Sequence, residues 1–163
     1  MSRCLLTLLW LLTVNTLLTA QEMPAANKVA WVNFGVLSQG IRVKYHITPD
    51  VLERYWFDDN SRKVDSARKK LPAEKWRQSR FVIDSIPALL LTAGTTTSSW
   101  GCLHCHDQPV VMVEVGFKDK QPAMYYHIDS DTIRIPASIR RYVMDIMEQT
   151  SRLIDVANKK KQP

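Results

Sequence analysis

The sequence predicts an α+β domain, in which about five antiparallel strands form one sheet and two helices pack on one of its faces. Several stretches alternate apolar and polar residues with the period of two that is typical of a β-strand. Short turns rich in Gly, Pro, Asp and Ser separate neighbouring strands, which favours antiparallel pairing. Two further stretches, after Pro72 and after Pro136, carry apolar residues at helical spacing. The expected order is three strands, a helix, two strands and a helix.

The chain opens with a segment typical of a secretory signal peptide, which places the protein in the periplasm or outside the cell. A short basic start precedes an uncharged, leucine-rich run that ends at Ala20, a small residue suited to cleavage. An uncleaved anchor is the alternative, because an apolar run of about 17 residues is near the lower limit for a membrane span. The expected organisation is a signal peptide (residues 1–20), a flexible leader (21–27), one α+β domain (28–158) and a basic tail (159–163).

The formal net charge is +6. The positive side chains gather in residues 62–80 and 159–161, and such patches either favour acidic partners or form an ordinary solvated face. No nucleic-acid-binding motif accompanies them, so we expect no nucleic-acid partner. No segment after residue 20 is apolar enough to suggest a transmembrane helix in the mature chain.

Three strands are expected in the first part of the chain, at residues 28–37, 41–48 and 51–57. In the first strand, the alternate residues expected to face the core are Ala30, Val32, Phe34 and Val36. Val29 and Trp31 are expected on the opposite face. In the second strand, the expected core residues are Ile41, Val43, Tyr45 and Ile47. Its expected water-facing residues are Arg42, Lys44, His46 and Thr48.

The middle of the chain is expected to hold two polar loops and one helix. Residues 58–70 form the first loop, and a helix then begins at Pro72. The positions that share one face of this helix are Ala73, Trp76, Arg80 and Ile83. Residues 86–93 are apolar but short, and they fit either a helix end or a buried strand. Residues 94–108 form the second loop.

The last part of the chain is expected to form a β-hairpin followed by a long helix. The hairpin strands are residues 110–117 and 123–128. The helix begins at Pro136 and carries an apolar stripe formed by Ile139, Tyr142, Val143, Ile146, Leu153, Ile154 and Ala157. This stripe is expected to pack on the sheet.

The segment WGCLHCHD, residues 100–107, carries the most specific chemistry in the chain. Cys102, Cys105 and His106 match the C-x-x-C-H pattern of c-type haem attachment, in which two thiols bond the porphyrin and the histidine binds the iron. A second axial ligand would come from one of four side chains: Met112, Met124, His127 or His46. A small c-type cytochrome is therefore one interpretation, with haem c as its cofactor.

A metal site is the second interpretation of this segment. Its ligands would be drawn from Cys102, His104, Cys105 and His106, completed by His127 or His46. The close spacing of these ligands and the lack of a second cysteine pair make a complete tetrahedral site difficult to build. A thioredoxin-type redox centre is disfavoured, because Pro109 and the valine-rich run after it replace the helix that such a centre needs.

A structural disulfide between Cys102 and Cys105 is the interpretation we favour. Cleavage of the signal peptide removes Cys4 and leaves these two cysteines in an oxidising compartment. The bridge would hold the loop where it enters the strand at Val110. This interpretation involves no cofactor.

No catalytic constellation is readable in the sequence. No Ser-His-Asp pattern, H-E-x-x-H motif or phosphate-binding loop is present, and Glu114 and the aspartates form no recognisable carboxylate pair. His46 and His127 are expected to be ordinary strand histidines. We therefore expect an exported, non-enzymatic binding or inhibitor-like domain with an unknown protein partner.

The order of elements and a few local matches resemble emfourin, a protein inhibitor of thermolysin-type metalloproteases, and small secreted bacterial domains related to it. The matches are residues 40–47 (GIRVKYHI), residues 71–76 (LPAEKW) and residues 101–105 (GCLHC), followed by the closing helix from Pro136. The resemblance covers residues 29–157. It implies an inhibitor-like α+β domain. No inhibitory residue carries over, because residues 34–40 (FGVLSQG) stand where that family has a GGFAG-like stretch.

Overall fold

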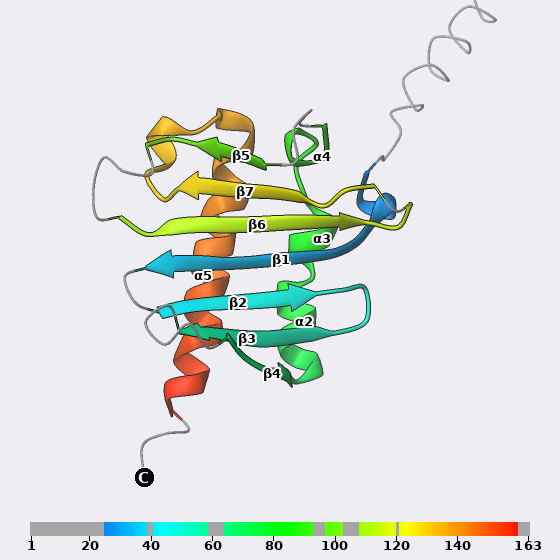
Figure 1. Cartoon of the computed structure of the whole chain (residues 1–163), viewed down its shortest axis with the longest axis vertical. Coiled ribbons are helices and arrows are strands. Elements are labelled where there is room, and N and C mark those ends of the chain that lie inside the picture. Colours follow the sequence, from blue (N-terminus) through cyan, green and yellow to red (C-terminus); the bar gives the residue numbers. More distant parts are fainter. Residues whose placement is uncertain are drawn as a thin grey trace, which may run out of the picture.

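The computed structural model describes residues 25–38, 41–58, 64–92, 97–102, 108–119 and 121–159. These residues form the α+β fold that the sequence predicts, with one sheet and a helical layer (Figure 1). The expected signal peptide and the last four residues of the expected tail lie outside the described residues. The end of the expected leader forms a 3-10 turn, η1 (Ala25–Lys28). Within the described residues, no helix is long and apolar enough to cross a membrane.

The sheet has seven strands, more than the five expected. They are β1 (Val29–Ser38), β2 (Ile41–Ile47), β3 (Leu52–Asp58), β4 (Val64–Lys70), β5 (Thr97–Trp100), β6 (Val110–Phe117) and β7 (Met124–Asp129). Their spatial order is β4-β3-β2-β1-β6-β7-β5, so β1 lies at the centre (Figure 1). The sheet is mixed and not purely antiparallel, because β5 pairs with β7 in parallel. The other pairings are antiparallel.

The two strands that lie in segments predicted to be loops, β4 and β5, form the edges of the sheet. β4 pairs only with β3, and β5 pairs only with β7. An edge strand is stabilised by backbone hydrogen bonds to one neighbour and needs few apolar side chains. β4 therefore ends in the charged residues Arg68, Lys69 and Lys70, and β5 consists mostly of Thr and Ser. Neither segment shows the alternation by which a half-buried strand is recognised.

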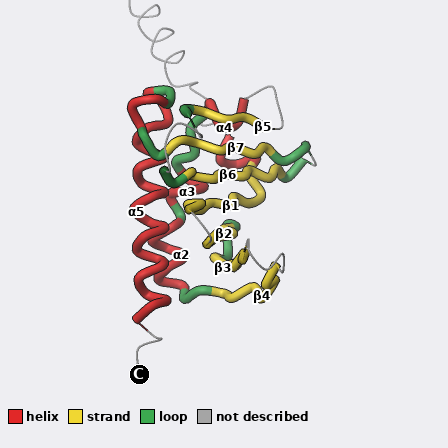
Figure 2. The backbone as a smooth tube through the Cα atoms, turned by 60° about the vertical axis from the view of Figure 1, so that its left-hand side comes forward, coloured by secondary structure: helices red, strands yellow, loops and turns green. Residues whose placement is uncertain are grey.

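The helices are also more numerous than the two expected. The expected first helix is divided into α2 (Ala73–Ser79) and α3 (Phe81–Asp84), and the short α4 (Leu89–Thr92) follows Pro87. A 3-10 turn, η2 (Thr132–Arg134), leads into the long helix α5 (Ala137–Lys159), which begins where the sequence predicts. Figure 2 shows α5, α2 and α3 together on one side of the sheet. We call the opposite side, which these three helices leave uncovered, the open face.

The core lies between the sheet and the helical layer. The sheet contributes Val32, Phe34, Tyr45, Ile47, Val111, Val113, Val115, Tyr126 and Ile128, all fully buried. The predicted stripe of α5 is confirmed at Ile139, Tyr142, Val143, Ile146 and Leu153, which are buried in the same cluster. Full burial of one such aliphatic or aromatic side chain contributes about 1.5–3 kcal/mol, so this cluster is the main source of stability.

Val29 is the one core residue that the strand pattern assigned to the wrong face. It is buried in the core, whereas Trp31 lies on the open face as expected. The pairing of β1 with β6 shifts register between these two residues. A β-bulge interrupts the alternation of side chains between the two faces of a strand. Val29 and Trp31, two residues apart, therefore lie on opposite faces of the sheet.

Polar side chains connect the two helical segments within the core. Tyr142 Oη donates to the Val82 carbonyl at 2.7 Å, and Gln149 Nε2 donates to Ser79 Oγ at 2.9 Å. Both bonds join α5 to the α2–α3 segment. They satisfy polar groups that would otherwise be costly to bury, and they set the position of α5 along its neighbours.

Candidate functional site

The structure describes only the start of the cysteine segment, for which the sequence predicts a disulfide, a haem attachment site or a metal site. Residues 103–107 lie outside the described residues, and with them His104, Cys105 and His106. The Cys102 amide donates to Asp129 Oδ2 at 2.9 Å, and the Asp131 amide donates to Asp129 Oδ1 at the same distance. Gly101, with a φ of 87°, packs its Cα side against the Asp129 side chain. The buried Asp129 carboxylate therefore holds the backbone at Gly101 and Cys102 against the end of β7.

The other predicted metal or haem ligands are not gathered at this loop. His127 lies on β7 opposite Met112, whereas His46 lies on β2, three strand positions away. Three strand spacings amount to roughly 14 Å, too far for His46 and His127 to bind one ion. Met124 Sδ accepts a hydrogen bond from Tyr126 Oη. In the described part of the chain, no group of three His, Cys, Asp or Glu side chains is placed to hold a metal.

Polar side chains instead gather on the open face at the centre of the sheet. The registers place Glu114 of β6 opposite Asn33 of β1, Asn33 opposite His46 of β2, and His46 opposite Glu53 of β3. Four polar residues thus form one row across four adjacent strands. Because side chains in register on one face lie about 5 Å apart, this row can form a continuous hydrogen-bonded chain.

Asn33 links Glu114 to His46. Its Nδ2 donates to Glu114 Oε2 at 2.5 Å, and its Oδ1 lies 2.7 Å from His46 Nδ1. Since Oδ1 can only accept, His46 Nδ1 carries the proton and Nε2 of the neutral ring is an acceptor. Lys44 Nζ completes the arrangement at 2.5 Å from Glu114 Oε1, so both oxygens of this carboxylate are engaged.

Aromatic rings surround His46. The Trp31 ring centroid lies 5.5 Å from that of His46, and the Tyr55 ring meets His46 edge-on at 6.1 Å. The Arg68 guanidinium lies over the Tyr55 ring, 5.1 Å from its centroid. These contacts connect β1, β2, β3 and β4, and they carry the site toward the β4 edge of the sheet.

Six of these residues line a hollow of about 460 Å³, which we call the open-face hollow: Trp31, Asn33, Lys44, His46, Tyr55 and Arg68. Its volume is in the range of small-molecule sites, and its lining combines aromatic rings with a few oriented polar groups, as such sites do. Chemically, it can stack a planar group, donate hydrogen bonds from its cations and accept one at His46.

Gly116 sets the position of the Trp31 indole. The two residues are cross-strand partners in β6 and β1, and a Cβ added at Gly116 would lie 2.1 Å from Trp31 Cε2. The indole therefore covers the glycine directly, an arrangement by which an aromatic side chain compensates a glycine in a strand. This contact holds one wall of the open-face hollow in place.

Burial lowers the pKa of the His46 ring below its ordinary value of 6.5. The Glu53 carboxylate, and more weakly that of Glu114, raise this pKa, whereas the cations Arg68 and Lys44 lower it. The unfolded chain consequently binds the proton more tightly than the folded protein does. The stabilising contribution of neutral His46 is present above about pH 6.5 and is lost as the pH falls below that value.

We expect the wild-type protein to lose more stability between pH 7 and pH 5 than the His46→Gln variant. Denaturant unfolding at both pH values measures the difference. An NMR titration of the His46 ring, assigned by comparison with the variant, should give a midpoint below 6.5 and the Nδ1-protonated tautomer. A midpoint at or above the ordinary value would contradict the burial and hydrogen bonding described for this ring.

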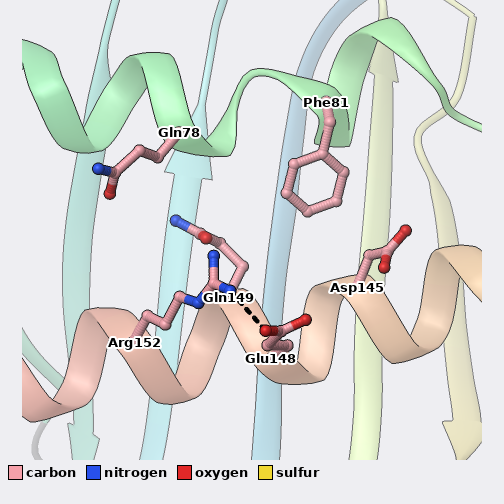
Figure 3. A pocket seen from close by; sticks show the side chains of 6 residues that line it. All are labelled: Gln78, Phe81, Asp145, Glu148, Gln149 and Arg152. Atoms are coloured by element: carbon pink, nitrogen blue, oxygen red, sulfur yellow. Dashed lines mark hydrogen bonds and ion pairs between the residues drawn. The ribbon is translucent and has the colours of Figure 1, made fainter.

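A second, smaller pocket of about 200 Å³ lies in the helical layer, between α2–α3 and α5 (Figure 3). It is lined by Gln78, Phe81, Asp145, Glu148, Gln149 and Arg152. The Arg152 guanidinium pairs with Glu148 along α5, and Asp145 pairs with Arg141. Because its charged groups are already paired within one helix, this pocket is the weaker candidate for a binding site.

The strand pattern of the sequence correctly predicts that His46 lies on a strand, but it does not indicate which residues contact it. Asn33 and Glu114 each interrupt an apolar strand, and that interruption is the signal that could have marked them. They are 81 residues apart in sequence, so nothing local indicates that they touch. Tyr55 and Arg68 come together because β4, which was taken for a loop, pairs with β3.

Comparison with protein-family models, with curated proteins and with solved structures yields no match to this chain.

Proposed function

We propose that this protein is an exported, non-enzymatic binding domain, and that the open-face hollow is its recognition site. The observation that carries the proposal is the hydrogen-bonded chain from Glu114 through Asn33 to His46, set among aromatic rings. The chain fixes the orientation of His46 before any ligand arrives. Preorganised polar groups between aromatic walls reduce the entropy cost of binding, because less side-chain motion remains to be lost.

The lining favours recognition over catalysis. Among the six lining residues, the only hydroxyl is the Tyr55 phenol, and none of the six is a serine, threonine or cysteine that could act as a nucleophile. The Lys44 ammonium is held by Glu114. These residues can stack against a ligand and bond to it, but they do not form a nucleophile–base pair.

An NMR fragment screen tests this proposal. The probes are indole, phenol, benzoate and benzamide, each titrated into the isotope-labelled protein. We expect the amide shifts to gather around Trp31, His46 and Tyr55 and to be lost in the Trp31→Ala variant. A matched control, Phe81→Ala in the helical pocket, should retain them. Shifts that gather at the helical pocket, or that persist in Trp31→Ala, would contradict the proposal.

The disulfide between Cys102 and Cys105 is part of the proposed structure of the domain. The Cys102 amide is held by Asp129, so a bridge there would fix the start of the loop against the end of β7. The ring closed by this bridge is small, so replacement of both cysteines by serine should lower the free energy of unfolding by only about 1–2 kcal/mol.

Intact-mass measurement of exported protein, alkylated with and without prior reduction, tests the bridge. We expect alkylation of these cysteines only after reduction. Two alkylated thiols in the unreduced sample would contradict the disulfide. A haem that remains attached after denaturation, together with a haem absorption band, would establish the c-type cytochrome alternative at Cys102, Cys105 and His106 instead.

A further inference from the structure

The open-face hollow is lined by two cations, and the carboxylate of Glu53 lies beside it on β3, opposite His46. Its lining carries the cations of Lys44 and Arg68 and no carboxylate. Both oxygens of Glu114 are engaged, one by Lys44 and the other by Asn33. A ligand in this hollow therefore meets the positive charge of its lining, whereas the Glu53 carboxylate lies next to the lining and is not part of it.

Arg68 is the cation best placed to bind a ligand anion. Its side chain is 64% exposed, and the nearest carboxylate oxygen described for it, on Glu53, lies 3.9 Å away, at the outer limit of an ion pair. Stacking on Tyr55 holds the guanidinium at the rim of the hollow. A planar guanidinium that is oriented in this way but loosely paired can bind a carboxylate through two parallel hydrogen bonds.

The aromatic side chains of the hollow favour a ligand with a planar, apolar ring. Trp31 and Tyr55 lie on opposite sides of His46 in the series of ring contacts, at centroid distances of 5.5 and 6.1 Å from it. Aromatic faces and edges favour contact with a planar, apolar group. Since Nε2 of neutral His46 accepts a hydrogen bond, the ligand gains further if it offers a donor such as a hydroxyl group.

We infer that the ligand of the open-face hollow is a small aromatic carboxylate, whose ring packs against the aromatic series Trp31–His46–Tyr55 and whose carboxylate binds Arg68. A hydroxyl group at the other end of the ring would donate to His46. This inference rests on the proposed function and specifies the ligand class of the same site.

The experiment compares two probes of nearly equal shape, 4-hydroxyphenylacetate and its neutral amide, 4-hydroxyphenylacetamide. Both are titrated by NMR and calorimetry at one low salt concentration and at pH 7.5. We expect the carboxylate to bind about tenfold more tightly than the amide, because a hydrogen-bonded charge pair contributes to the carboxylate alone. Added salt should reduce this preference, since Arg68 is exposed.

The Arg68→Gln variant should bind both probes about equally, because the charge that distinguishes the carboxylate from the amide is then absent. Lys69→Gln removes an adjacent exposed cation of β4 that does not line the hollow, and it should retain the wild-type preference. Circular dichroism checks that both variants keep the fold. A preference that survives in Arg68→Gln would overturn the role of Arg68.

The two proposals fail in different ways. Equal binding of both probes to the wild-type protein at the hollow would overturn the anionic ligand class and leave the binding function standing. Binding of neither probe, while fragments of the earlier screen still gather at Trp31, would likewise overturn only the ligand class. If no fragment gathers at Trp31, the proposed function itself is overturned.

Discussion

Replacement of Ile146 by Asp is expected to lower the free energy of unfolding by about 4 kcal/mol, the largest effect of any single change considered. Ile146 is fully buried on the face of α5 that packs on the sheet, within the cluster that also contains Val143 and Leu153. An aspartate there would be either an unpaired charge in an apolar environment or a protonated acid without a hydrogen-bond partner. Denaturant unfolding monitored by circular dichroism measures the loss.

Met144→Asp is the matched control, because it introduces the same side chain into the same helix at a position that is 50% exposed. Its effect should stay within about 0.5 kcal/mol, as is usual for surface substitutions. Equal stability of the Ile146→Asp and Met144→Asp variants would show that α5 is not packed on the sheet in solution.

Gly101→Ala is expected to lower the free energy of unfolding by about 3 kcal/mol. Gly101 has a φ of 87°, which an alanine adopts only with strain. The added Cβ would also lie 2.3 Å from the Cβ of Asp129, an atom close to the backbone that cannot move aside easily. The strain and the clash act together, because Asp129 also holds the Cys102 amide.

Thermal and denaturant unfolding measure this loss, and hydrogen exchange at the Cys102 amide reports whether its bond to Asp129 has broken. Ser99→Ala, at an exposed position two residues earlier in β5, is the control and should be close to neutral. A Gly101→Ala protein with wild-type stability and slow exchange at Cys102 would mean that the turn adopts another backbone conformation.

The elements predicted correctly from the sequence are those whose apolar residues recur with the period of a strand or of a helix. β2, β6 and α5 have apolar residues at the correct period over a long enough run, so their position and inner face follow from local sequence. β4 and β5 lack this pattern because each contributes to the fold through backbone pairing with one neighbour. That pairing depends on partners far along the chain, and a local pattern does not report it.

The candidate site was missed for a related reason. Lys44 and Glu114 are 70 residues apart in sequence. They come close because β1 pairs with β2 on one edge and with β6 on the other, which brings the strands of both residues into one sheet. Read alone, Lys44 is an ordinary water-facing strand residue and Glu114 an isolated acid. The cysteine segment is recognisable in the sequence because its residues are adjacent, whereas the residues of the open-face hollow are brought together only by strand register.

The central place of β1 has a consequence for how the chain reaches this structure. β1 pairs on one edge with β2, which follows it directly in the sequence. Its other edge pairs with β6, which is far along the chain: Asn33 and Glu114, which meet there, are 81 residues apart. Contacts of such long range slow folding, because the loop must close before the contacts form. A nascent chain that ends before Val110 would hold the β1–β4 meander with an unpaired central edge and no α5 to cover its apolar face. The sheet can therefore be completed only once most of the chain has emerged, and until then this edge is open to pairing with other chains.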